Sequence, residues 1–99
     1  MPIFALGVNH ISAPVEVREQ LAFAADELAD RLRELFAEPG IGEVAIVSTC
    51  NRTEIYAVLE SEAAKQTLLQ WLCRTRKVGA DWLSQYLYQH SGADAVRHL

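Results

Sequence analysis

Two strand-like runs of the sequence stand so close together that they predict a hairpin. The apolar run EVAIVST ends at Thr49, and the alternating run TEIYAVLE begins at Thr53. Only Cys50, Asn51 and Arg52 separate the two runs. So short a connection joins antiparallel strands, because a parallel pair needs a crossover of a dozen or more residues. This join carries a thiol and a guanidinium where tight hairpins usually carry Asn-Gly or Gly-Gly.

The segment before the hairpin predicts a strand and two helices. Residues 3–9, IFALGVN, are a continuous apolar run typical of a buried strand. Pro14 can open a short helix over residues 15–23, because proline fits the first helical turn. Apolar residues then recur at helical spacing up to Phe36, before Pro39 and Gly40 break the pattern. Asp26 is the expected N-cap of this second helix.

The segment after the hairpin completes a recognisable order of elements. Ser61 is expected to cap a helix, whose apolar stripe is Ala64, Leu68, Trp71 and Leu72. A short helical turn over 80–85, an aromatic edge strand over 86–90 and the beginning of a helix at 92–99 follow. We therefore predict an α+β, ferredoxin-like βαββαβ domain with an antiparallel sheet, helices on one face and the start of a further helix at the C-terminus. That last helix has no stop signal, so we expect residues 1–99 to be one domain of a longer protein.

Composition narrows the class of protein. Ninety-nine residues suffice for one core, and the net charge of −4 argues against a dedicated nucleic-acid-binding domain. The one basic cluster, CRTRK at 73–77, is expected to be solvated charge at a helix end. No apolar run approaches the roughly 20 residues of a membrane span, and no secretory leader is visible. We expect a soluble cytosolic protein with free thiols and, given the scattered histidines and the lack of CxxC, no metal site.

The two cysteines call for different interpretations. Cys73 stands beside Trp71 and Leu72 on an amphipathic helix, which is typical of a small packing residue. Cys50 ends an apolar strand at a polar corner, which indicates a candidate nucleophile. Arg52 could favour the thiolate of Cys50, hold a substrate carboxylate with its planar fork, or simply pair with Glu54 at the surface.

Three motifs point to a family. In the order GVNHISAPVEVRE, STCNRTEIY and AVRHL, the chain resembles over essentially its whole length the N-terminal catalytic domain of glutamyl-tRNA reductase. The resemblance implies an oxidoreductase that uses NADPH to reduce glutamyl-tRNA(Glu) to glutamate-1-semialdehyde through a cysteine thioester. That reaction opens the five-carbon route to 5-aminolevulinate and the tetrapyrroles.

The resemblance also implies roles for individual residues. Cys50 corresponds to the nucleophile, and Thr49, Asn51 and Arg52 to neighbours that line the glutamate pocket with it. We assign Arg52 to the substrate carboxylate first and to the thiolate second. His98 corresponds to a histidine important for activity, as a general acid or base or by orienting the carbonyl; from spacing alone it would pair with Asp94, four residues earlier.

Two other histidines receive structural interpretations. His10 is expected to hold the turn before Pro14, and His90 is expected at the surface.

The resemblance further implies parts that this chain lacks. The only glycines after the hairpin are Gly79 and Gly92, so no GxGxxG loop can seat NADPH, and cofactor-binding and helical dimerisation domains are expected elsewhere. Glutamyl-tRNA as substrate, a homodimer of the full-length protein and the downstream glutamate-1-semialdehyde aminomutase are the expected partners, with no membrane. The chain alone would then be at most a weak esterase. The alternative is a non-enzymatic ferredoxin-like module that binds a ligand or partner, in which Cys50 is no more reactive than Cys73.

Overall fold

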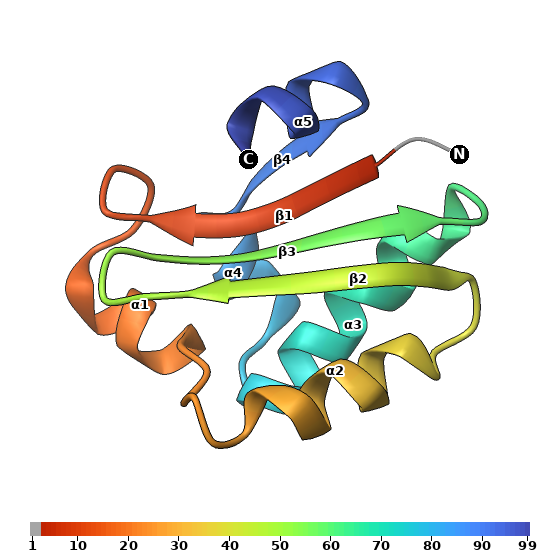
Figure 1. The fold of residues 1–99 in the computed structure, drawn as a ribbon. Coiled ribbons are helices and arrows are strands. Elements are labelled where there is room, and N and C mark those ends of the chain that lie inside the picture. Colours follow the sequence, from red (N-terminus) through yellow and green to blue (C-terminus); the bar gives the residue numbers. More distant parts are fainter. Residues whose placement is uncertain (1–2) are drawn as a thin grey trace.

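The computed structural model of the protein describes residues 3–99. Its elements follow the predicted order of strand, helices, hairpin, helices, strand and a final helix (Figure 1). None of the helices in this range is both long and apolar enough to cross a membrane. In chain order the elements are β1 (Ile3–Asn9), α1 (Val15–Leu21), α2 (Leu28–Phe36), β2 (Ile41–Ser48), β3 (Arg52–Leu59), α3 (Ala63–Arg76), α4 (Ala80–Ser84), β4 (Tyr88–Ser91) and α5 (Ala93–His98).

The four strands form one antiparallel sheet in the order β2-β3-β1-β4. Strands β1 and β3 therefore lie in the middle, and β2 and β4 lie at the edges. The predicted βαββαβ order and the predicted edge position of the last strand are confirmed. Strand β1 has the predicted limits, whereas β2 begins at Ile41, two residues before the run EVAIVST, because Ile41 pairs with Leu59 across a register shift.

The sheet presents two different faces. Alternate residues of the central strands, such as Leu6 and Ile55, pack against α1 to α4 and form the main core. The opposite face carries a smaller cluster, in which Ala5 and Tyr56 pack with Ala95 of α5. In Figure 1 the sheet accordingly separates α5 from the other helices. The prediction of helices on one face thus holds for α1 to α4, and the further helix covers part of the other.

Both predicted helix caps are wrong by one residue. The N-cap of α2 is Glu27 rather than Asp26, and the N-cap of α3 is Glu62 rather than Ser61. Neither N-cap uses its side chain to cap its own helix. The Glu27 carboxylate instead accepts hydrogen bonds from the Ala24 N–H at 2.8 Å and from Arg76 at 2.8 Å. The Glu27 side chain is thus engaged by a residue before α2 and by a tertiary partner, and it does not cap its own helix.

Arg76 is a structural residue of this fold. Its guanidinium donates to the Ala22 carbonyl oxygen at 2.7 Å and lies over the Phe23 ring at 4.4 Å. The prediction that the basic cluster is solvated charge is wrong for this residue, since its side chain is only 12% exposed. The hydrogen bond from Arg76, followed by those from Ala24 and Arg31, lowers the pKa of Glu27 to about 2.

Candidate active site

Thr49 shapes the hairpin that carries the predicted nucleophile. Its backbone N–H donates to the Arg52 carbonyl oxygen at 2.8 Å. Its Oγ1 accepts hydrogen bonds from the N–H groups of Asn51 and Arg52, both at 3.2 Å. A threonine hydroxyl can replace a carbonyl as the acceptor inside a tight turn, so the loop needs no glycine. This turn leaves Cys50 exposed.

The second cysteine lies in a different environment. Cys73 is half-buried on α3 and packs against the main core, where burial raises the pKa of its thiol. A thiol in such surroundings is a poor nucleophile, because the thiolate is the reactive form. The prediction that Cys73 is a packing residue is confirmed.

A pocket of about 340 Å³ opens beside the hairpin. It brings together four of the predicted site residues and three others. Cys50 is not among the lining residues, although its neighbours on both sides in the sequence are. The pocket is lined by Asn9, His10, Thr49, Asn51, Arg52, Glu54 and His98.

Glu54 is the buried centre of this pocket. Its side chain is 1% exposed, and its carboxylate accepts hydrogen bonds from Tyr56 Oη at 3.1 Å and Tyr88 Oη at 2.5 Å. His98 Nε2 lies 2.5 Å from the same carboxylate. Burial alone would raise the pKa of Glu54, but the hydrogen bonds from Tyr88, Tyr56 and His98 and the charge of Arg52 outweigh burial and lower it. Glu54 is therefore an ionised acceptor inside the sheet.

The pKa values of the two tyrosines shift in the opposite direction to that of Glu54. Burial first, and then the hydrogen bond to Glu54, raise the pKa of Tyr56 to about 12. The same two causes raise the pKa of Tyr88 well above its usual range. Both phenols consequently stay protonated and donate to Glu54 throughout the pH range in which enzymes work.

Gly7 makes room for this carboxylate. It lies directly opposite Glu54 in the pairing of β1 with β3. A Cβ atom at Gly7 would lie 2.6 Å from the Thr53 carbonyl oxygen and 2.8 Å from Glu54 Cγ. Only a residue without a side chain allows the two central strands to approach so closely here. The glycine of the motif GVNH thus has a packing function under the site.

Arg52 is positioned by the same carboxylate. Its Nε lies 3.5 Å from Glu54 Oε1, and its side chain is 42% exposed. The predicted pairing of Arg52 with Glu54 is confirmed, although Glu54 is buried rather than at the surface. Among residues 3–99 the Arg52 side chain donates no hydrogen bond, so its planar N–H edge stays available to a substrate.

His98 is brought to the site from the last helix. Its Nε2 lies against the carboxylate of Glu54, 44 residues earlier in the sequence, so α5 returns to β3 beside the hairpin. The pairing with Asp94 suggested by spacing is wrong, because Asp94 pairs with Arg97 instead. An ionised carboxylate only accepts, so Nε2 of His98 carries the proton and Nδ1 is the nitrogen left for other partners.

His90 and Tyr88 support the His98 ring. The ring centroids of His90 and His98 are 4.4 Å apart, and those of Tyr88 and His98 are 5.0 Å apart. The prediction that His90 is a surface residue is wrong, because the alternation of β4 places its side chain on the same face as α5. Its half-buried ring fixes one side of His98.

His10 also differs from its predicted role. Hydrogen bonds of Asn9 and Ser12 hold the turn before Pro14: Asn9 Oδ1 accepts from the N–H groups of Ile11 and Ser12, and Ser12 Oγ accepts from the Asn9 N–H. His10 is exposed and lines the pocket. Sequence reasoning missed Asn9, His10 and Glu54 as lining residues, although all three stand within the motifs GVNH and STCNRTE.

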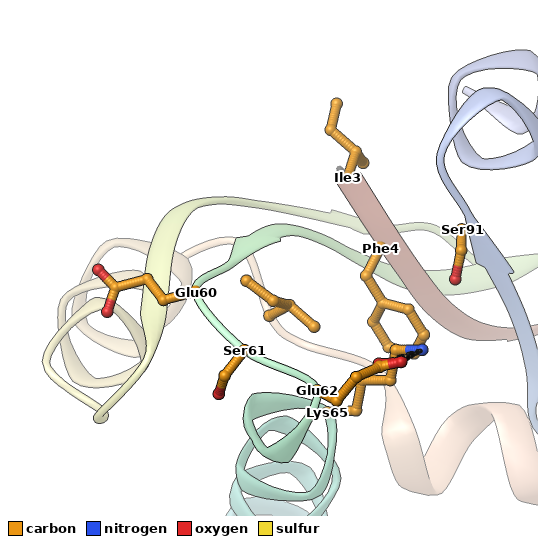
Figure 2. A pocket seen from close by; sticks show the side chains of 8 residues that line it. Ile3, Phe4, Glu60, Ser61, Glu62, Lys65 and Ser91 are labelled. Atoms are coloured by element: carbon orange, nitrogen blue, oxygen red, sulfur yellow. Dashed lines mark hydrogen bonds and ion pairs between the residues drawn. The ribbon is translucent and has the colours of Figure 1, made fainter. Parts of the chain in front are cut away.

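A second pocket, of about 350 Å³, lies at the other end of β1 (Figure 2). Five residues of strand, or about 16 Å, separate its Phe4 from Asn9 of the first pocket. Lys65 lies over the Phe4 ring at 5.3 Å and pairs with Glu62 at 2.8 Å, so its charge is already compensated. This pocket contains no predicted site residue. It is lined by Ile3, Phe4, Leu59, Glu60, Ser61, Glu62, Lys65 and Ser91.

The described residues do not fit a dinucleotide. A phosphate-binding glycine loop leads from a strand into a helix. Gly40 and Gly42 instead lead from α2 into β2, and Gly79 and Gly92 stand alone. Within residues 3–99, no group of three or more His, Cys, Asp or Glu side chains is arranged to hold a metal ion.

Comparison with known proteins gives a consistent result. Residues 6–99 match the family described as "Glutamyl-tRNAGlu reductase, N-terminal domain". The chain is 50% identical to the glutamyl-tRNA reductase of Alkalilimnicola ehrlichii and 46% identical to that of Methylococcus capsulatus, in both cases over all 99 residues. It spans only 22% and 23% of the lengths of these two relatives. The structure of the glutamyl-tRNA reductase from Methanopyrus kandleri resembles it with a TM-score of 0.63 and 25% identity, over 97% of this chain and 20% of that one.

Proposed function

We propose that this chain accepts the glutamyl group of glutamyl-tRNA on Cys50. The chain belongs to the glutamyl-tRNA reductase family and corresponds to the N-terminal domain of the enzyme. One observation above all supports this function. The exposed Cys50 stands between residues that line a pocket, and that pocket holds both a guanidinium and a histidine from the far end of the chain. The alternative of a ligand-binding module gives no reason for Arg52 and His98 to line one pocket beside Cys50.

The acyl transfer can be written with the residues of this chain. The Cys50 thiolate attacks the ester carbonyl carbon, a C–S bond forms, and the C–O bond to the terminal ribose of the tRNA breaks. The released ribose oxygen takes up one proton and leaves as a hydroxyl. In this proposal His98 Nδ1 takes the proton that the Cys50 thiol loses and passes it to that oxygen, because Nε2 stays hydrogen-bonded to Glu54. The product is a glutamyl thioester on Cys50.

Arg52 is the proposed selector of the glutamyl side chain. Its free planar edge can take a carboxylate through two parallel hydrogen bonds, a geometry that lysine cannot reproduce. Thr49 and Asn51 complete the wall of the pocket beside it. An acyl group without the carboxylate leaves the outer N–H donors of Arg52 without an acceptor, which disfavours the wrong aminoacyl ester.

The remaining parts of the reaction lie outside these residues. In the proposed enzyme, reduction of the thioester to glutamate-1-semialdehyde uses NADPH bound by another domain, and dimerisation uses a further helical domain. Residues 1–99 are then the catalytic domain of a cytosolic enzyme that opens tetrapyrrole synthesis. The aminomutase that consumes the semialdehyde is a proposed partner of the complete enzyme.

Covalent labelling tests the proposal. The chain is incubated with tRNA charged with radiolabelled glutamate, and acid-stable label is located by peptide mass spectrometry. We expect label on Cys50, its loss in Cys50→Ala, and its retention in Cys73→Ala, the matched control. Arg52→Lys should lose the preference for glutamyl-tRNA over glutaminyl-tRNA. Equal labelling of both cysteines, or label that persists in Cys50→Ala, would contradict the proposal.

A further inference from the structure

Arg18 links α1 to the hairpin that carries Cys50. Its Nη1 donates a hydrogen bond to the backbone carbonyl oxygen of Cys50 at 3.2 Å, across 32 residues of sequence. Within the described chain, the other hydrogen bonds of residues 49–51 stay inside the hairpin. Among the described residues, Arg18 therefore donates the one hydrogen bond by which another element holds residues 49–51.

The helix that carries Arg18 is firmly seated. Val17 and Leu21 of α1 are buried in the main core. Two residues after the helix, the Phe23 N–H donates to Ser48 Oγ, at the end of β2, at 2.9 Å. The segment 17–23 thus contacts the hairpin at two points, one on each side of Thr49. A guanidinium on so fixed a support has little freedom to move away from the loop.

The charge of Arg18 is not compensated by a carboxylate. No acidic group in residues 3–99 lies within 4.0 Å of its guanidinium, whereas Arg52 is paired with Glu54. The Nε of Arg18 is buried and has no hydrogen-bond partner in the same range. The uncompensated positive charge at the hairpin accordingly comes from Arg18, not from Arg52, which the sequence had suggested for this purpose.

From this geometry we infer that Arg18 is a positioning residue for acyl transfer: it fixes the main chain of Cys50 and maintains a positive charge beside the nucleophile. The inference rests on the proposed function for its substrate. The restraint on the loop and the positive charge beside Cys50 can both be measured without tRNA. Arg18, the arginine of the segment APVEVRE, thus has a proposed role distinct from that of Arg52.

Two alkylating reagents measure the charge directly. Iodoacetate is anionic and iodoacetamide is neutral, and both react with the thiolate, so the ratio of their rates at Cys50 does not depend on the thiolate fraction. In Arg18→Gln we expect the iodoacetate-to-iodoacetamide ratio to fall about threefold, the effect that Coulomb's law gives for one unit charge at a separation of about 6 Å in water. Arg18→Lys should retain the ratio. Arg33→Gln, which removes an exposed arginine of α2, is the matched control and should leave it unchanged.

Single-turnover transfer from glutamyl-tRNA measures the positioning. Arg18→Gln should lower the rate of labelling at saturating glutamyl-tRNA about tenfold, with little change in the concentration that half-saturates it. An unchanged rate ratio together with unchanged transfer would overturn the inference. A ratio that responds to Arg18→Gln while the wild-type chain accepts no glutamyl group would refute the proposed function and leave the charge of Arg18 established.

Salt provides a second measurement if Arg18→Gln does not fold. In the wild-type chain, 0.5 M salt should lower the rate ratio at Cys50 towards that of the unfolded peptide of residues 47–54, which contains Arg52 but not Arg18. A ratio equal to that of the peptide already at low salt would overturn the inference.

Discussion

Gly7→Ala is expected to disturb the candidate active site, although Gly7 does not itself line the pocket. The added Cβ would lie 2.6 Å from the Thr53 carbonyl oxygen and 2.8 Å from Glu54 Cγ. The first of these neighbours is backbone in the middle of the sheet, so it cannot rotate away. Strands β1 and β3 must separate locally, and the Glu54 carboxylate must shift from its tyrosine partners.

The expected size of the effect follows from two opposing contributions. Overpacking a close-packed interior costs about 1–3 kcal/mol. Replacing glycine by alanine makes the unfolded chain less flexible and returns about 0.4–1 kcal/mol. We therefore expect a net loss of about 0–2.6 kcal/mol in the free energy of unfolding, centred near about 1.3 kcal/mol. For a domain of this size each kcal/mol shifts Tm by about 4–8 °C, so the central value corresponds to a fall in Tm of about 5–10 °C.

Gly79→Ala is the matched control for this substitution. No atom lies within 4 Å of a Cβ at Gly79, and its backbone is in the extended region, with φ −81° and ψ 147°. We expect a change within about 0.5 kcal/mol, because a weaker N-cap offsets the stiffer unfolded chain. Circular dichroism during thermal and urea unfolding measures both variants. A Gly7→Ala protein as stable as Gly79→Ala would refute the close approach of β1 and β3 at this position.

Two carboxylates give pH-dependent predictions. Glu54→Gln should destabilise the chain by about 1–3 kcal/mol at pH 7, because three hydrogen bonds lose their charged acceptor. Folding lowers the pKa of Glu54, so its ionised form stabilises the fold above the ordinary value of 4.5, and urea unfolding should show the two proteins converging as pH falls below it. For Glu27→Gln the loss should also be present above pH 4.5, and it should disappear gradually as pH falls to about 2, the folded pKa of Glu27. Thermal unfolding across this pH range tests it, and a constant difference between Glu27→Gln and the wild type would contradict the pairing with Arg76.

The fold was predictable because its signals are local. The alternation of Ile55, Ala57 and Leu59 and the apolar stripe of α3 each reflect which side of an element faces the core. Short connections then determined which strands are antiparallel. The helix caps were not predictable in the same way, because Glu27 is held by Arg76, 49 residues away. Local capping preference is weaker than such a contact.

The site was predictable only where a motif marked it. The pocket brings together Thr49, Asn51, Arg52 and His98 but not Cys50, and the binding of substrate by these residues stays a prediction. Glu54 was seen only as a partner for Arg52, because an acidic residue in an alternating strand is ordinarily at the surface. Its burial depends on hydrogen bonds from donors 34 and 44 residues later in the chain, and no local sequence pattern indicates those donors.

In the proposed reaction, Arg52 binds the carboxylate of the substrate and Arg18 acts on the nucleophile. Glu54 approaches Arg52 at Nε, which orients the guanidinium and leaves its outer edge open to a carboxylate. Arg18 uses one N–H to hold the carbonyl of Cys50 and keeps its own charge uncompensated. Loss of Arg52 should therefore reduce the choice of aminoacyl group while the thiol stays reactive. Loss of Arg18 should reduce the reactivity of Cys50 towards anionic reagents while the choice of aminoacyl group is retained, so that the pair of substitutions separates recognition from attack.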